Sequence, residues 1–237
     1  MKKLLVFVCM LGLTAGLASA SLLELEVTDG TNTALINSSG SLVITGSASG
    51  VAVTSTPGVY TFDGTVGNYN VNVSTGVASP VLDVGELDLN SENTASGSNS
   101  GPLEIWFSVN GITELFGGWE LDWGGTITGK TSDSVTYEAY QSNLNAFFGT
   151  TNLIGTIGPE SPTKANVPFA FSGTTSGGVA GVTSGYSLTQ EIIINGSGKT
   201  SYSGDASLTP VPEPASIVLV GAGLLALCKL RRRTVKP

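Results

Sequence analysis

The sequence predicts an all-β protein, an antiparallel β-sandwich or jelly roll that is flanked by an N-terminal signal helix and a short C-terminal transmembrane helix. Three observations support this fold class. Short runs with an apolar residue at every second position recur through residues 21–209, which is the period of a half-buried strand. Turn sequences rich in glycine, asparagine and aspartate separate these runs at intervals of roughly 8–15 residues. The same segment is rich in serine, threonine and asparagine and poor in charged residues, a composition common in secreted β-proteins.

The alternating runs place about a dozen strands in this central domain. The expected strands span residues 23–27, 41–45, 51–55, 59–62, 68–73, 86–89, 103–109, 119–123, 135–140, 153–157, 167–171, 186–194 and 202–208. The run at 103–109 has the clearest alternation, with Leu103, Ile105 and Phe107 on the expected core face and Trp106 out of phase with them. Residues 192–194 are apolar on both faces, which is typical of a central strand that is covered on both sides.

Other segments allow a second interpretation or predict loops. Apolar and aromatic residues between 137 and 147 also fit the spacing of a helix, although the richness in valine, threonine and tyrosine favours strand–turn–strand. Residues 91–101 are small and polar, and residues 172–184 are low in complexity. We expect loops in both places.

Residues 1–20 have the three parts of a secretory signal peptide. Lys2 and Lys3 form a charged start, and an apolar run follows from residue 4 to residue 17. Small residues end the segment, which predicts cleavage between residues 20 and 21. The residues expected to define this site are Ala18, Ala20 and Ser21.

Residues 210–237 form three blocks. Residues 211–215 hold two prolines around one glutamate, which keeps the segment extended and open to a protease. Residues 216–230 form an apolar span of about 22 Å if helical, shorter than a bilayer core of roughly 30 Å. Residues 231–237 form a basic tail. The expected membrane stop, which holds this end in the cytoplasm, consists of Lys229, Arg231, Arg232 and Arg233.

The succession of Pro212, Glu213 and Pro214, an apolar span and an arginine cluster resembles the PEP-CTERM sorting signal. The resemblance implies a protein exported by a Gram-negative bacterium that makes extracellular polysaccharide. It implies an exosortase-type membrane protease as partner, which processes the chain near residues 212–214 while the inner membrane holds it in transit. It also implies a final location at the cell surface or in the extracellular matrix. Residues 67–76, 87–91 and 186–190 are similar to ectodomains common among such proteins, which supports the fold and adds little chemistry.

Charge and missing residue types limit what residues 21–209 can do. This segment carries three basic residues against 17 acidic ones, a formal net charge of −14, whereas the whole chain has −8. Such a surface repels nucleic acid and anionic lipid, so we expect no nucleic-acid partner. The chain has no histidine, which excludes Ser–His or Cys–His catalysis and histidine-based zinc sites. Both cysteines, Cys9 and Cys228, lie in the end segments, so the central domain is not a disulfide scaffold.

One carboxylate pair is a candidate for catalysis. Glu120 and Asp122 are two positions apart in an expected strand and share a face, with Cα atoms about 6.6–7 Å apart. This separation suits the paired carboxylates of glycoside hydrolysis. The motif resembles the active strand of one family of β-glucan hydrolases, but a tryptophan and two glycines stand where that family needs a second glutamate. The alternative is a solvent-facing strand with Trp119, Leu121 and Trp123 buried behind it.

Trp106 is a candidate glycan contact, because a tryptophan that faces away from the core can stack on a sugar ring. Core packing in a second layer is the alternative. No aspartate-containing loop has the ligand spacing of a calcium site, and we expect neither a metal nor a cofactor. The leading hypothesis is an exported, non-enzymatic envelope protein with a structural or adhesive β-domain. The alternative is a glycan-binding module of the exopolysaccharide matrix, and a glycoside hydrolase is a third hypothesis.

Overall fold

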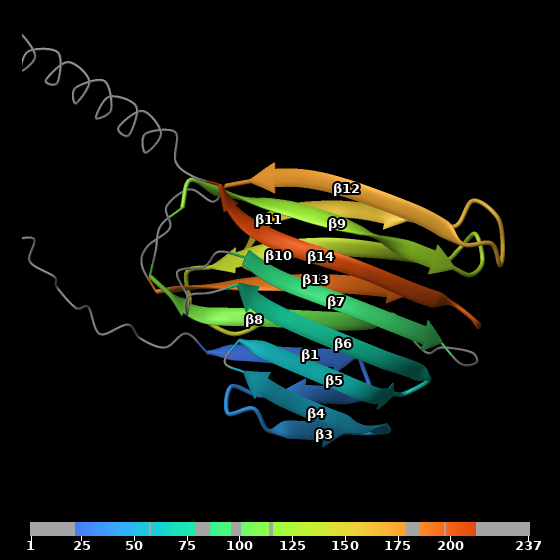
Figure 1. The fold of residues 1–237 in the computed structure, drawn as a ribbon, viewed down its shortest axis with the longest axis horizontal. Helices are drawn as coiled ribbons and strands as arrows, with labels where there is room; N and C mark the ends of the chain where they lie inside the picture. Colours follow the sequence, from blue (N-terminus) through green and yellow to red (C-terminus); the bar gives the residue numbers. More distant parts are fainter. Residues whose placement is uncertain are drawn as a thin grey trace, which may run out of the picture.

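The computed structural model describes residues 22–56, 58–78, 86–95, 101–113, 116–178, 185–196 and 198–211. Within this part, fourteen strands form two antiparallel seven-stranded sheets that pack face to face as a β-sandwich (Figure 1). The predicted all-β antiparallel sandwich is therefore confirmed. No helix in these ranges has the length and apolarity that a membrane crossing requires.

The first sheet, sheet A, lies at the back of Figure 1 and has the order β11-β10-β13-β8-β1-β2-β3. Its strands are β1 (Leu23–Thr28), β2 (Thr33–Ile36), β3 (Leu42–Thr45), β8 (Leu103–Ile112), β10 (Ser134–Ser142), β11 (Asn152–Glu160) and β13 (Tyr186–Asn195). The second sheet, sheet B, lies in front and has the order β12-β9-β14-β7-β6-β5-β4. Its strands are β4 (Ala48–Thr56), β5 (Val59–Val66), β6 (Tyr69–Ala78), β7 (Glu86–Ala95), β9 (Gly118–Thr128), β12 (Phe169–Gly177) and β14 (Ser201–Val211).

The last two strands occupy inner positions of the two sheets. β13 lies between β10 and β8, and β14 lies between β9 and β7. The ladder between β14 and β9 runs from the pair Ser201 and Thr128 to the pair Val211 and Gly118. The final strand therefore continues two residues past the domain boundary expected at residue 209. The start of β1 and the end of β14 lie at the same end of the sandwich (Figure 1).

Alternate residues from the two sheets meet in one continuous core. On β8 the fully buried apolar residues include Leu103, Ile105, Phe107 and Val109, as the alternation predicts. Full burial of one such side chain stabilises the fold by about 1.5–3 kcal/mol. Trp123 packs in the same core, and its ring centroid lies 4.5 Å from that of Phe171. Its indole Nε1 donates a hydrogen bond of 2.9 Å to the Tyr202 hydroxyl, which satisfies a buried donor.

Three segments differ from the sequence-based expectations. The short strand β2 was not expected, although Ala34 and Ile36 alternate inward along it. Residues 91–95 belong to β7 and not to a loop, because ladders with β6 and β14 hold this polar stretch on both sides. Residues 172–177 belong to the edge strand β12, which pairs with β9 through serine, threonine and glycine. In the last two cases backbone pairing stabilises a strand whose side chains carry little apolar signal.

The strand–turn–strand interpretation of residues 135–147 is confirmed, because β10 ends at Ser142 and a loop of turns, 143–151, leads to β11. The signal peptide, the sorting motif, the expected apolar span and the basic tail lie outside the described residues, apart from the first residues of the C-terminal segment in β14.

Removal of the Tyr202 hydroxyl tests the polar contact in the core. We expect Tyr202→Phe to lower the free energy of unfolding by about 1–3 kcal/mol, because it leaves the buried Trp123 Nε1 donor without its acceptor. Urea denaturation of the purified chain measures this. The control is Tyr60→Phe, since the Tyr60 hydroxyl makes only a long 3.4 Å bond to the Asn37 carbonyl. Equal effects of the two variants would contradict the assignment.

Candidate functional site

The outer face of sheet A brings glutamates and aromatic rings from several strands together. The register pairs Glu26 of β1 with Trp106 of β8, Trp106 with Glu191 of β13, and Glu191 with Glu138 of β10. Directly paired side chains on one sheet face have Cβ atoms about 4.5–5.5 Å apart. We use the name acidic–aromatic face for the outward side chains of this row and its neighbours: Glu26, Glu104, Trp106, Glu138, Tyr140 and Glu191.

Two rings form the centre of the acidic–aromatic face. The centroids of Trp106 and Tyr140 lie 6.5 Å apart at an interplanar angle of 22°, a stacked arrangement. Both side chains are half-buried and turn away from the core, as the alternation predicts for Trp106. The indole Nε1 of Trp106 donates a 3.3 Å hydrogen bond to Glu104 Oε2. The pair offers an apolar surface with polar groups at its rim, which is the chemistry that stacking on a sugar ring requires.

Glu191 is the most buried carboxylate of the face, with 4% of its surface exposed. Burial raises the pKa of its carboxyl group to about 8, and the charges of Glu104 and Glu138 add to the rise. A hydrogen bond from Tyr140 acts in the opposite direction. Burial, followed by the charges of Glu104 and Glu24, also raises the pKa of Glu26. The groups that act on Glu191 include no cation.

The Tyr140 hydroxyl lies between two of these carboxylates. It donates to Glu138 Oε2 and lies 3.3 Å from Glu191 Oε2. Because a hydroxyl has one proton, it cannot donate fully to both acceptors at once. Burial and the hydrogen bond to Glu138 raise the pKa of Tyr140, so it remains a donor at neutral pH. Thr156 of β11 donates a 3.3 Å bond to Glu138 Oε1 and extends the polar network across a further strand.

The loop 143–151 closes one side of the face. Its Asn145 Oδ1 accepts a 2.6 Å hydrogen bond from the Gly111 amide, and its Phe148 amide donates a 3.1 Å bond to Ser108 Oγ. Ser187 Oγ donates to the Ala146 carbonyl at 2.7 Å. Ser108 and Ser187 point outward from sheet A and yet have no exposed surface, because the loop covers them. Trp106 and Ser108 are two positions apart on β8 and share its outer face. The contact of the loop with Ser108 therefore lies next to the aromatic pair.

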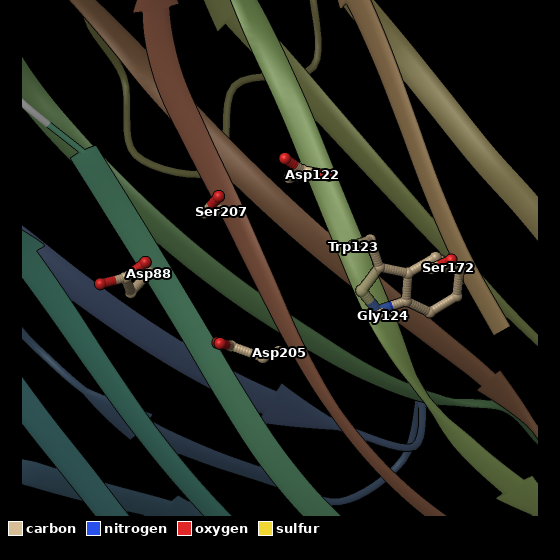
Figure 2. Close-up of a pocket in the computed structure, with 7 residues that line it drawn as sticks. All are labelled: Asp88, Asp122, Trp123, Gly124, Ser172, Asp205 and Ser207. Carbon is tan, nitrogen blue, oxygen red and sulfur yellow. The ribbon is translucent and has the colours of Figure 1, made fainter. Parts of the chain in front are cut away.

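The outer face of sheet B carries a second acidic feature, a shallow groove of about 320 Å³. Figure 2 shows its lining side chains on three neighbouring strands and on β12. The residues that line this aspartate groove are Asp88, Asp122, Trp123, Gly124, Ser172, Asp205 and Ser207. The described residues contain no cluster of histidine, cysteine, aspartate and glutamate side chains that is suited to a metal ion.

The candidate catalytic pair lies on this outer face of sheet B. Glu120 and Asp122 are both exposed and share one side of β9, while Trp119, Leu121 and Trp123 are buried behind them. Asp122 accepts a 2.5 Å hydrogen bond from Thr174 Oγ1 on β12. Asp122 lines the aspartate groove and Glu120 does not. In the folded chain Asp122 therefore shares a groove with Asp88 and Asp205. Glu120, the partner that the sequence spacing suggested, does not line this groove.

The other predicted site residues lie outside the described residues. They are Ala18, Ala20, Ser21, Pro212, Glu213, Pro214, Lys229, Arg231, Arg232 and Arg233. Their roles in cleavage, sorting and membrane insertion remain predictions.

The sequence analysis missed most of the acidic–aromatic face. Alternation in the 103–109 strand placed Trp106 out of phase with the core, and the same pattern in the 135–140 strand could have placed Tyr140 there. The missed residues come from four strands that meet only through the pairing of β1 with β8 and of β13 with β8 and β10.

Residues 210–233 match the PEP-CTERM protein-sorting motif. The chain therefore carries this sorting signal, as the resemblance predicts. The motif implies a secreted protein that transits the membrane and is processed by an exosortase. A comparison with curated proteins finds no match.

Several solved structures show remote similarity to the chain. The enzymatically active domain of tailspike protein 4 of bacteriophage CBA120 shares 9% identity at a TM-score of 0.29, over 57% of this chain and 18% of that chain. The K3 cleaved adhesin domain of Lys-gingipain from Porphyromonas gingivalis shares 14% identity at 0.29, over 51% and 74%. A xylan-binding domain from Paenibacillus barcinonensis shares 7% identity at 0.33, over 71% and 99%. The chain thus spans a small part of the tailspike domain, and TM-scores this low establish neither a shared fold nor a shared function.

The charge state of Glu191 predicts how stability depends on pH. Its pKa is about 8 in the folded chain and near 4.5 when unfolded, so the folded chain binds this proton more tightly between these values. The contribution is therefore fully present below about pH 4.5 and is lost as the pH rises to about 8. We expect Glu191→Gln, which cannot ionise, to reduce the fall in the free energy of unfolding over this range by ~1–2 kcal/mol.

Urea denaturation at about pH 5 and about pH 8 measures the effect. The control is Glu120→Gln, because Glu120 is an exposed glutamate on the other sheet. Wild type and Glu191→Gln with the same pH dependence would show that Glu191 does not titrate between these values.

Proposed function

We propose that the protein is an exported, non-enzymatic component of the cell envelope or extracellular matrix, with an adhesive β-domain that is delivered by its C-terminal sorting signal. The observation that carries the proposal is the PEP-CTERM motif at residues 210–233. β14 extends to Val211 and so overlaps the first residues of the motif. Processing close to residues 212–214 would therefore act next to the sandwich and leave its core strands whole.

The geometry of the sandwich fits delivery from one end. The start of β1 and the end of β14 both lie at the same end of the two sheets (Figure 1). A domain that is held at this end keeps the outer faces of both sheets available to the surrounding matrix. The acidic–aromatic face and the aspartate groove then lie on opposite sides of the domain, one on each sheet.

Variants of the sorting signal test delivery. We expect Glu213→Ala, or deletion of Arg231, Arg232 and Arg233, to leave the unprocessed chain in the inner membrane, because the protease motif or the membrane stop is lost. Cell fractionation and the intact mass of the protein measure this. The matched control is Lys236→Ala, since Lys236 is basic but lies beyond the matched motif. Normal processing of both motif variants would contradict the proposal.

A second candidate function, glycan binding, is favoured by the stacked pair of Trp106 and Tyr140. Two adjacent half-buried rings present a flat apolar surface, and carboxylates at their rim accept hydrogen bonds from sugar hydroxyls. The loop 143–151 bounds this surface on one side. In this role the domain would attach the exported protein to the exopolysaccharide of the cell that makes it.

Loss of the indole ring tests glycan binding. We expect Trp106→Ala to weaken retention of the full chain on the host's own polysaccharide by about tenfold, the equivalent of one aromatic stacking contact of about 1.4 kcal/mol. A pull-down on the immobilised polysaccharide measures retention, and circular dichroism checks the fold. Asp122→Asn on the opposite sheet is the control. If wild type is not retained, or Trp106→Ala is retained equally well, this candidate function is wrong.

The glycoside-hydrolase hypothesis rests on Glu120 and Asp122 and stays an untested alternative. Its test is hydrolysis of the same polysaccharide by wild type, together with its loss in Glu120→Gln. The proposal of a non-enzymatic protein fails if that loss is observed.

A further inference from the structure

The acidic–aromatic face has an unbalanced charge. Glu26, Glu104, Glu138 and Glu191 come from four strands that lie side by side in sheet A. Burial, the charges of Glu104 and Glu138 and the hydrogen bond from Tyr140 set the pKa of Glu191, and no cation is among these influences. Like charges at such short separations are unfavourable unless a proton or an external cation compensates them.

The Glu191 side chain is the second observation that indicates a ligand. It is 96% buried, since 4% of its surface is exposed, and only Oε2 has a donor, the Tyr140 hydroxyl at 3.3 Å. Among the described residues no hydrogen bond reaches Glu191 Oε1. Glu191 Oε1 is not among the fully buried side-chain oxygens that lack a partner, so it keeps contact with solvent and is open to a donor from outside the chain.

The class of ligand follows from the rings and the carboxylates together. A neutral sugar stacked on Trp106 would remove the remaining water from the glutamates and make their ionised forms less favourable. An anionic sugar would add repulsion. A sugar with a primary ammonium group instead supplies the missing countercharge, donates up to three hydrogen bonds, and interacts favourably with the face of an aromatic ring.

We propose that the acidic–aromatic face binds a glycan with free primary amino groups, with one ring stacked on Trp106 and Tyr140 and its ammonium group held by Glu191, Glu104 and Glu138. This inference rests on the second candidate function, glycan binding. It adds the chemical class of the ligand. Glu191 is the central residue of the site. It lies in the register between Trp106 and Glu138, and no described group of the chain donates to its Oε1.

The titration of the face follows from this arrangement. The groups that face Glu191 are Glu104 and Trp106 on β8 and Glu138 and Tyr140 on β10; Glu26 lies beyond Trp106 on β1. The covering loop 143–151 contains no charged residue. An ammonium group favours the ionised form of Glu191, so binding of the charged ligand releases the proton that the free site holds.

A matched pair of ligands tests the proposal. The probes are two glucosamine oligomers of equal length, one with free amines and one fully N-acetylated, titrated calorimetrically into the full chain in detergent at about pH 6, where the amines are charged. We expect wild type to bind the free-amine oligomer at least about tenfold more tightly. Glu191→Gln should reduce this preference to less than about threefold, and Glu120→Gln on the opposite sheet should keep it.

Glu191→Gln preserves the shape of the side chain and removes a like charge, so we expect it to fold. Glu104→Gln is the second variant and should reduce the preference in the same direction. Equal affinity of wild type for the two oligomers, or a preference that both glutamine variants retain, overturns the proposal. If wild type is retained on the host polysaccharide through Trp106 but shows no preference for free amines, this inference fails while the second candidate function stands.

A lysine oligomer separates the glycan from a basic peptide. We expect Trp106→Ala to lose affinity for the free-amine oligosaccharide and to bind the lysine oligomer as wild type does, because only the sugar ring needs the stacking surface. A lysine oligomer that binds wild type more tightly than the free-amine sugar does, with a similar loss in Trp106→Ala, would show that the face recognises a basic polypeptide and would overturn the proposal.

Discussion

The alternation of inward-facing and outward-facing side chains along the strands determines both the fold and the candidate site. The chain has no disulfide in its central domain, so the contact between the inner faces of the two sheets must hold the sandwich together. Because successive side chains of a strand point to opposite sides, each buried residue fixes its neighbours on the outside. Burial of Ile105 and Phe107 in the core thus requires that Trp106 point away from it.

Alternation explains why much of the fold was predictable and why the site was not. In β8 and β9 large apolar residues at every second position identify both the strand and its core face. In β7 the inward positions include Ser91 and Asn93, with 0% and 2% exposed surface, so the pattern predicted a loop. The candidate site depends on register. Trp106 and Glu191 are 85 residues apart in the sequence and meet only because β13 pairs with β8. No local pattern in either strand contains this information.

The acidic residues of the domain lie in different environments on the two sheets, which the net charge does not show. The formal charge of −14 over residues 21–209 describes a surface that favours solubility. The fold distributes that charge unevenly. Asp122 and Asp205 lie on the open face of sheet B, where water can solvate them. Glu191 lies among other glutamates and beside two rings, where burial raises the pKa of its carboxyl group.

The difference between the two acidic surfaces decides which of them is the better candidate for binding. Carboxylates in the aspartate groove are bordered by glycine and serine, and the described residues place no exposed aromatic ring there, since Trp123 packs in the core. A ligand in that groove would meet hydrated carboxylates and little apolar surface, so it would have to remove water for few new contacts. On sheet A part of that cost is already present in the folded protein, because only 4% of the surface of Glu191 is exposed. A site that is desolvated before binding favours a ligand that restores charge balance, and Glu191 on sheet A meets this condition.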